Sequence, residues 1–165
     1  MARPVADPLT RGAWLGGLRL VSVDGCEWAV PDNQANAAEF GYPGGGAGGA
    51  FPQARLVGLV ECGSRAFWAA RIGAVRGAGS GEQSLARELY PLLEPDMLLL
   101  ADRNFYSFGD WCAATGTGAE LLWRMDSDLR LPSCRHCRTA PTCRSCSTAR
   151  SGGRPRTPAA GCGRR

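Results

Sequence analysis

Five short apolar runs limit the folds open to this chain: no helix-like segment is predicted between the first three, and each of the last two follows one. The first run alternates apolar and polar side chains, as a half-buried β-strand does. The second and third flank a Gly63-Ser64 turn, which predicts a hairpin. The fourth is apolar without alternation, which is typical of a central strand buried on both faces. The five predicted strands are residues 18–23, 54–60, 66–72, 97–101 and 119–124.

Two helices are predicted between the later strands. In residues 82–93 the leucines recur at helical spacing, and Pro95 ends the pattern. Residues 107–114 form a second, shorter candidate helix. The order is therefore three strands, helix, strand, helix, strand. This order predicts an α/β fold with a mixed five-stranded sheet and helices on its faces.

The segments outside these elements are predicted to be loops. Residues 1–17 and 31–53 are rich in turn-forming residues. The glycines between Gly41 and Gly49 favour a flexible loop over a phosphate cradle, because no strand leads directly into them and no Lys-Ser/Thr pair follows.

Two aspartates, Asp24 and Asp102, each follow an apolar run directly. If their strands are parallel neighbours, the two carboxylates lie side by side at one edge of the sheet. Adjacent carboxylates repel unless a cation lies between them, and hard oxygen ligands suit Mg²⁺ or Mn²⁺. The alternative is that each aspartate merely caps a turn. Spacing alone does not exclude Glu61 as a further acid.

Charge is unevenly distributed along the chain. The formal net charge is +4, yet all 15 acidic residues precede Pro132, and residues 133–165 carry arginine as their only charged type. Such a basic tail is typical of a solvated segment that tolerates nucleic acid. No apolar run approaches the roughly 20 residues of a membrane span, and no signal segment opens the chain. A soluble, cytoplasmic protein without membrane partners is expected.

The amino-acid sequence around the two aspartates resembles that of bacterial DDE transposases of the insertion-sequence-four group. Val21-Ser-Val-Asp24-Gly25 resembles the segment around their first catalytic acid, and Leu98-Leu-Leu-Ala-Asp102-Arg103-Asn104-Phe105 resembles the second. The similarity runs from about residue 8 to Pro132. Further similar segments are residues 30–41, 54–63, 81–86, 121–124 and 129–132.

That resemblance implies a ribonuclease-H-like fold and metal-dependent cleavage and transfer of DNA strands at transposon ends, with a homodimer in the intact family. It implies that Asp24 and Asp102 are catalytic acids that hold Mg²⁺ or Mn²⁺. Arg103 and Asn104 are expected to contact DNA or to support the metal site.

Three departures from the family pattern lead us to expect a truncated, inactive copy. Cys26 stands where relatives commonly carry a small hydroxyl residue. The family's third acid lies in a Tyr-x2-Arg-x3-Glu-x6-Lys pattern, but no Glu follows Glu120 and the chain has no Lys. Only 23 residues precede Asp24, where relatives have a DNA-binding region. The expected domains are a loop remnant at 1–17, a partial, incomplete catalytic domain at 18–132, and an irregular tail at 133–165.

The tail has two interpretations of its own. Cys134-x2-Cys137 and Cys143-x2-Cys146 could hold zinc, which would make a small zinc-dependent nucleic-acid-binding module the alternative function. However, the five residues between the pairs form a tight loop, and nothing apolar follows to pack around a metal. A frameshift is favoured, because one GC-rich back-translation of 133–148 in a shifted frame gives a family-like continuation. The third interpretation is a basic tail that has no function.

Overall fold

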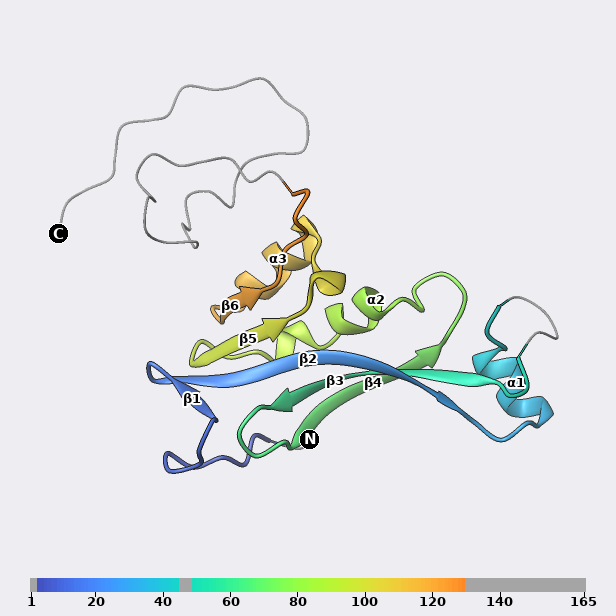
Figure 1. The fold of residues 1–165 in the computed structure, drawn as a ribbon, viewed down its shortest axis with the longest axis horizontal. Helices are drawn as coiled ribbons and strands as arrows, with labels where there is room; N and C mark the ends of the chain where they lie inside the picture. Colours follow the sequence, from blue (N-terminus) through green and yellow to red (C-terminus); the bar gives the residue numbers. More distant parts are fainter. Residues whose placement is uncertain (1–2, 45–48, 130–165) are drawn as a thin grey trace, which may run out of the picture. The chain divides into compact units, whose positions relative to one another are not determined.

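A computed structural model describes residues 3–44 and 49–129. The predictions for the tail at 133–165, including its cysteines, lie outside the described residues. Figure 1 shows the arrangement of the elements. The strands are β1 (Trp14–Leu15), β2 (Leu18–Ala29), β3 (Gln53–Glu61), β4 (Phe67–Ala74), β5 (Met97–Ala101) and β6 (Glu120–Trp123). The helices are α1 (Gln34–Phe40), α2 (Glu82–Arg87), η1 (Tyr90–Leu92), η2 (Arg103–Phe105) and α3 (Phe108–Thr115).

The strands form one mixed sheet in the order β4-β3-β2-β5-β6, with β1 paired to β2 outside this path. The β4-β3-β2 portion is antiparallel, and β2-β5-β6 is parallel. The predicted mixed α/β sheet is confirmed, and so is the predicted central position of the strand at 97–101. The short strand β1 is an addition, because it lies in a segment expected to be loop.

The strand β2 is longer than predicted. It was expected to end before Asp24, but it continues to Ala29, and its pairing with β3 runs on from Asp24↔Gly58 to Ala29↔Gln53. Asp24-Gly25 is a turn signal when taken alone. Here the cross-strand ladder with β3 outweighs that local preference, so Asp24 lies inside a strand.

Two helical segments also differ from expectation. The segment 31–53 contains the helix α1, which begins where the Asn33 side chain accepts a hydrogen bond of 2.9 Å from the Asn36 amide. The helix expected at 82–93 is divided into α2 and the 3₁₀ helix η1. Pro91 lies in the first turn of η1, and because proline has no amide hydrogen and crowds the preceding turn, an α-helix cannot run through this position unbroken.

The hydrophobic core lies on one face of the sheet, beneath α2, η1 and α3. Val21 and Val57 of the sheet pack there with Leu85 and Leu89, and Ala114 of α3 joins them. In Figure 1, α1 lies at the far end of β2 and β3, away from α2 and α3. The face of the sheet that contributes to this core is therefore the face covered by these helices.

The opposite face of the sheet, which we call the open face, carries large apolar side chains that remain more than half exposed. The cross-strand pairs Leu56↔Ile72 and Val60↔Phe67 assign β3 and β4 residues to it, because directly paired residues share a face. The same alternation places residues of β2 and β6 there. Among these side chains, Trp28 is 53% exposed, Phe67 62%, Ile72 60% and Leu122 56%.

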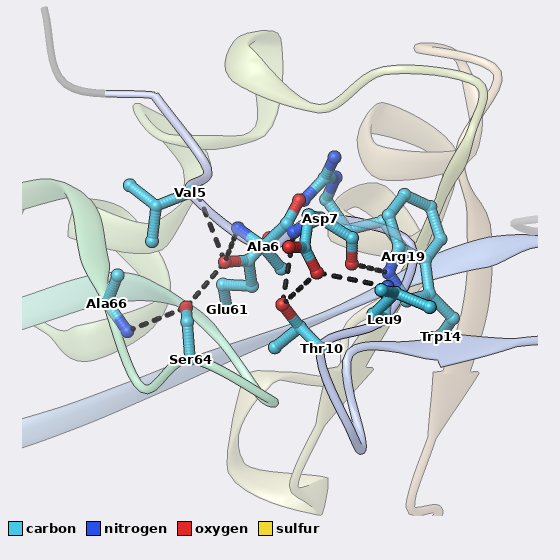
Figure 2. Close-up of polar contacts among 10 residues, drawn as sticks. All are labelled: Val5, Ala6, Asp7, Leu9, Thr10, Trp14, Arg19, Glu61, Ser64 and Ala66. Atoms are coloured by element: carbon cyan, nitrogen blue, oxygen red, sulfur yellow. Dashed lines mark hydrogen bonds and ion pairs between the residues drawn. The ribbon is translucent and has the colours of Figure 1, made fainter.

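A set of polar contacts, which we call the N-terminal clamp, ties the start of the chain to the end of β3. The Glu61 carboxylate is fully buried and forms an ion pair with Arg19. It also accepts hydrogen bonds from the amides of Val5, at 3.2 Å, and Ala6, at 2.8 Å, and from the Ser64 hydroxyl. Figure 2 shows these groups converging on Glu61 from the N-terminal segment, β2 and the β3–β4 turn. The described part of the N-terminal segment is therefore held against the sheet.

Candidate functional site

An open depression of about 610 Å³, which we call the cavity, lies beside the middle of β2 and the ends of β5 and β6. It includes both aspartates singled out in the sequence. The register explains why: Ser22 pairs with Leu100 in the parallel ladder, and Asp24 and Asp102 follow each of these by two positions. The lining residues are Ser22, Val23, Asp24, Leu100, Ala101, Asp102, Leu122, Trp123 and Arg124.

Both carboxylates are exposed and anchored in the same local way. Asp24 Oδ1 accepts a hydrogen bond of 2.8 Å from the Gly25 amide, and Asp102 Oδ1 accepts one of 2.7 Å from the Arg103 amide. Asp102 is thus the N-cap of η2, the capping role weighed as the alternative to a functional one. Asp24 does not end a strand, so a turn-capping role does not explain it.

The cavity contains one charged residue that sequence reasoning missed. Arg124 follows β6, and its guanidinium lies 3.7 Å from Asp102 Oδ1. Its backbone amide donates to the Ala101 carbonyl at 2.9 Å, which fixes its position beside the end of β5. The side chain is 73% exposed, so this ion pair contributes little to stability and leaves the guanidinium accessible to solutes.

The two expected DNA contacts differ in their surroundings. Arg103 and Asn104 are both exposed residues of η2. The Asn104 amide group donates to the Glu82 carboxylate, and its backbone carbonyl accepts a hydrogen bond of 2.6 Å from the Gln83 side chain. Asn104 therefore has structural partners in the first turn of α2.

The other acids considered in the sequence do not line the cavity. Glu61 pairs with Val21 on the core face and is engaged in the N-terminal clamp, whereas Asp24 lies on the open face. Glu120 pairs with Leu98, so it lies four residues before Arg124 along β6, or roughly 13 Å at 3.3 Å per residue. Asp126 and Asp128 follow β6 and are also outside the lining.

The donor set at the cavity suits a single hard cation. Within residues 3–44 and 49–129, no group of three or more His, Cys, Asp or Glu side chains is placed to hold a metal ion. Mg²⁺ is commonly held by only one or two carboxylates, with water and substrate phosphate completing its coordination. Asp24 and Asp102 fit that pattern for one ion.

The described residues also bear on membrane association and thiol chemistry. No helix among them is long and apolar enough to cross a membrane. Cys26, Cys62 and Cys112 are free thiols. Burial raises the pKa of the Cys62 thiol, which disfavours its reactive thiolate.

Comparison with known proteins supports the family resemblance. The chain is 32% identical over 108 residues to the transposase InsG for insertion sequence element IS4 of Escherichia coli (strain K12). The matched region is 65% of this chain and 24% of that protein, so the chain spans about a quarter of its relative's length. No family model matches, and no solved structure matches. The chain resembles insertion-sequence-four transposases.

Proposed function

We propose that this chain is the metal-binding portion of a DDE transposase catalytic domain with a ribonuclease-H-like fold. The observation that carries the proposal is that Asp24, within β2, and Asp102, just after the neighbouring parallel strand β5, line one cavity although they lie far apart in the sequence. The sheet order, with three antiparallel strands followed by two parallel ones, supports the fold assignment. The similarity to an insertion-sequence transposase supports DNA as the substrate.

In this proposal the chain's own residues bind and orient. Asp24 and Asp102 hold a divalent cation, Mg²⁺ or Mn²⁺, from two adjacent strands. Such a cation, when bound, activates an attacking oxygen and neutralises charge on a phosphodiester. Arg124, accessible at the same cavity, attracts the phosphate backbone of a transposon end and balances the charge of Asp102. Arg103 is proposed as a further phosphate contact.

The chain by itself is proposed not to cleave DNA. Two-metal phosphodiester chemistry uses carboxylates to hold both cations, and the described residues offer donors for one. Glu61 cannot replace the third acid without leaving the N-terminal clamp. Glu120 lies at the start of β6, whereas the cavity lies at the end of that strand. Removing one member of a catalytic unit commonly abolishes most of the rate.

Mn²⁺ titration of the full chain, followed by electron paramagnetic resonance of the free ion, tests the metal site. Asp24→Asn and Asp102→Asn should each weaken Mn²⁺ binding at least about tenfold, because each removes one of two charged ligands. Asp96→Asn, an exposed aspartate outside the cavity lining, is the matched control and should leave the affinity unchanged. Equal affinities for the parent chain and both site variants would refute the proposal.

A DNA end-cleavage assay tests the predicted lack of activity. The parent chain and an Asp102→Ala variant are incubated with the element's terminal DNA and Mg²⁺ or Mn²⁺. Neither should yield a cleaved product. Cleavage by the parent that disappears in Asp102→Ala would show that another acid completes the site.

A further inference from the structure

Two side chains from the first turn of α2 hold the segment that follows Asp102. The Glu82 carboxylate accepts a hydrogen bond from the Asn104 side-chain amide. The neighbouring Gln83 side chain donates to the Asn104 backbone carbonyl at 2.6 Å. Asn104 lies in the middle of η2, two residues after Asp102. The start of α2 therefore holds η2, the short helix for which Asp102 is the N-cap.

The same Glu82 carboxylate also lies against the segment that carries Asp24. A Cβ atom built on Gly25 would come within 2.6 Å of Glu82 Oε1 and 2.9 Å of its Cδ. Any side chain at position 25 would therefore require the end of the Glu82 side chain to shift, and a glycine within a strand often marks such a close approach. One carboxylate thus contacts both aspartate-bearing segments, from the core side of β2.

A purely local role for Glu82 explains only part of this geometry. An acidic residue in the first turn of a helix interacts favourably with the helix dipole. That role requires no contact with Asn104 or Gly25, and it would affect α2 rather than η2. The convergence of contacts from two other segments on one side chain indicates a role in relating those segments to each other.

We propose that Glu82 is a positioning residue that fixes the separation of Asp24 and Asp102 by holding Asn104 on one side and resting on Gly25 on the other. This inference rests on the proposed metal site. The inference gives Asn104 a role in supporting that site rather than in contacting DNA. The reason is that the Asn104 side-chain amide donates its hydrogen bond to Glu82 of α2. The carboxylate pair depends on Glu82 for its geometry, although Glu82 is not a metal ligand.

Three variants of the full chain test the role of Glu82. Glu82→Ala removes the acceptor for Asn104. Glu82→Gln keeps an acceptor oxygen of the same reach and is the conservative rescue. Glu88→Ala is the matched control, because Glu88 follows the same helix but pairs with Arg71 on the surface.

The first measurement needs no metal. The amides of Phe105 and Tyr106 donate to Asp102 and Arg103 within η2, each at 3.1 Å, so their hydrogen exchange reports whether this turn is held. Glu82→Ala should accelerate exchange of both amides about tenfold, as expected for the loss of one side-chain hydrogen bond. Glu82→Gln and Glu88→Ala should exchange at nearly the parent rate.

The second measurement is Mn²⁺ affinity. Glu82→Ala should weaken binding about tenfold, the usual cost of losing a group that orients a metal ligand, and Glu82→Gln should restore most of it. Unchanged exchange in Glu82→Ala, or equal effects from Glu88→Ala, would overturn the inference. If the parent chain shows no Mn²⁺ binding sensitive to Asp24→Asn, the proposed function fails instead, and the exchange rates alone decide whether Glu82 holds the turn.

Discussion

Replacing Glu61 with glutamine should destabilise the protein more than any substitution at a surface ion pair. The Glu61 side chain is fully buried, and each of its oxygens faces donors: Arg19 on one side, and two backbone amides with the Ser64 hydroxyl on the other. Glutamine has the same shape but carries an NH₂ group in place of one oxygen. Either orientation of the amide therefore sets a donor against a donor.

The size of the effect follows from what is lost. Breaking a buried ion pair from one side costs about 3–5 kcal/mol. The Arg19 side chain is 16% exposed and can partly hydrate, so we expect about 3 kcal/mol, the lower end of that range. Domains of this size have a free energy of unfolding of roughly 5–15 kcal/mol. With a urea m-value of about 2 kcal/mol/M, the unfolding midpoint should fall by about 1.5 M.

The effect should also depend on pH. Burial acts to raise the pKa of Glu61, but hydrogen bonds from Ser64, the backbone and Arg19 outweigh it and hold the pKa below the ordinary value of 4.5. A carboxyl whose pKa is lowered on folding contributes stability that is fully present above its unfolded pKa and lost as the pH falls through its folded pKa. The difference between the parent and Glu61→Gln should therefore be largest above about pH 4.5 and shrink below it.

Urea unfolding followed by tryptophan fluorescence, at pH 7 and in the acid range, measures both effects. Glu88→Gln is the control, because its side chain is 59% exposed and such pairs contribute about 0–1 kcal/mol. A Glu61→Gln midpoint that matches the control would refute the reasoning. It would mean that Glu61 does not hold the N-terminal segment to the sheet.

Three further predictions concern packing, capping and the open face. Gly63→Ala should destabilise by about 1–3 kcal/mol in urea unfolding, because a Cβ there would lie 2.5 Å from the Ala13 amide nitrogen. Ser107→Ala should destabilise by about 1 kcal/mol in the same assay, because the Ser107 side chain caps α3 by accepting from the Asp110 amide at 3.0 Å. Ile72→Thr should reduce self-association in sedimentation velocity with little loss of stability, because Ile72 is 60% exposed on the open face.

Each of these predictions has a clear contrary outcome. A Gly63→Ala protein as stable as the parent would show that the segment around Ala13 moves freely away from the turn. An unfolding midpoint that Ser107→Ala leaves unchanged would show that other contacts stabilise the start of α3. Self-association that persists in Ile72→Thr would place the contact outside this part of the open face.

The succession of β2 to β6 along the chain could be predicted from the sequence because each of these strands contains a separate apolar run with its own turn signals. The extent of β2 could not, because the Asp24-Gly25 pair is locally a turn signal and only pairing with β3 shows that the strand continues. The helix α1 was missed for a related reason: its seven residues bury none of their side chains, so no apolar periodicity marks it.

The site was predictable to a similar degree. Asp24 and Asp102 were found because each follows an apolar run, and the parallel register brings them to one cavity. Their role as metal ligands stays a prediction. Arg124 and Glu82 were missed because their places depend on how β6 and α2 dock on the sheet. One signal could have pointed to Glu82: a glycine within a strand, at Gly25, marks a close approach by another segment.

The antiparallel and parallel parts of the sheet can form at different times during synthesis of the chain. β3 and β4 are joined by a short turn, whereas the ladder between β2 and β5 pairs Arg19 with Met97. Local pairings form before distant ones, because closing a long loop costs more entropy. At roughly 5–20 residues per second, synthesis from the end of β4 to the end of β5 takes about 1–5 seconds. Throughout that time the backbone of β2 is an unpaired edge that can recruit strands from other chains. The arrival of β5 covers the part of this edge from Arg19 to Ser22 and brings Asp102 to the cavity, and the later pairing of β6 with β5 completes the cavity lining.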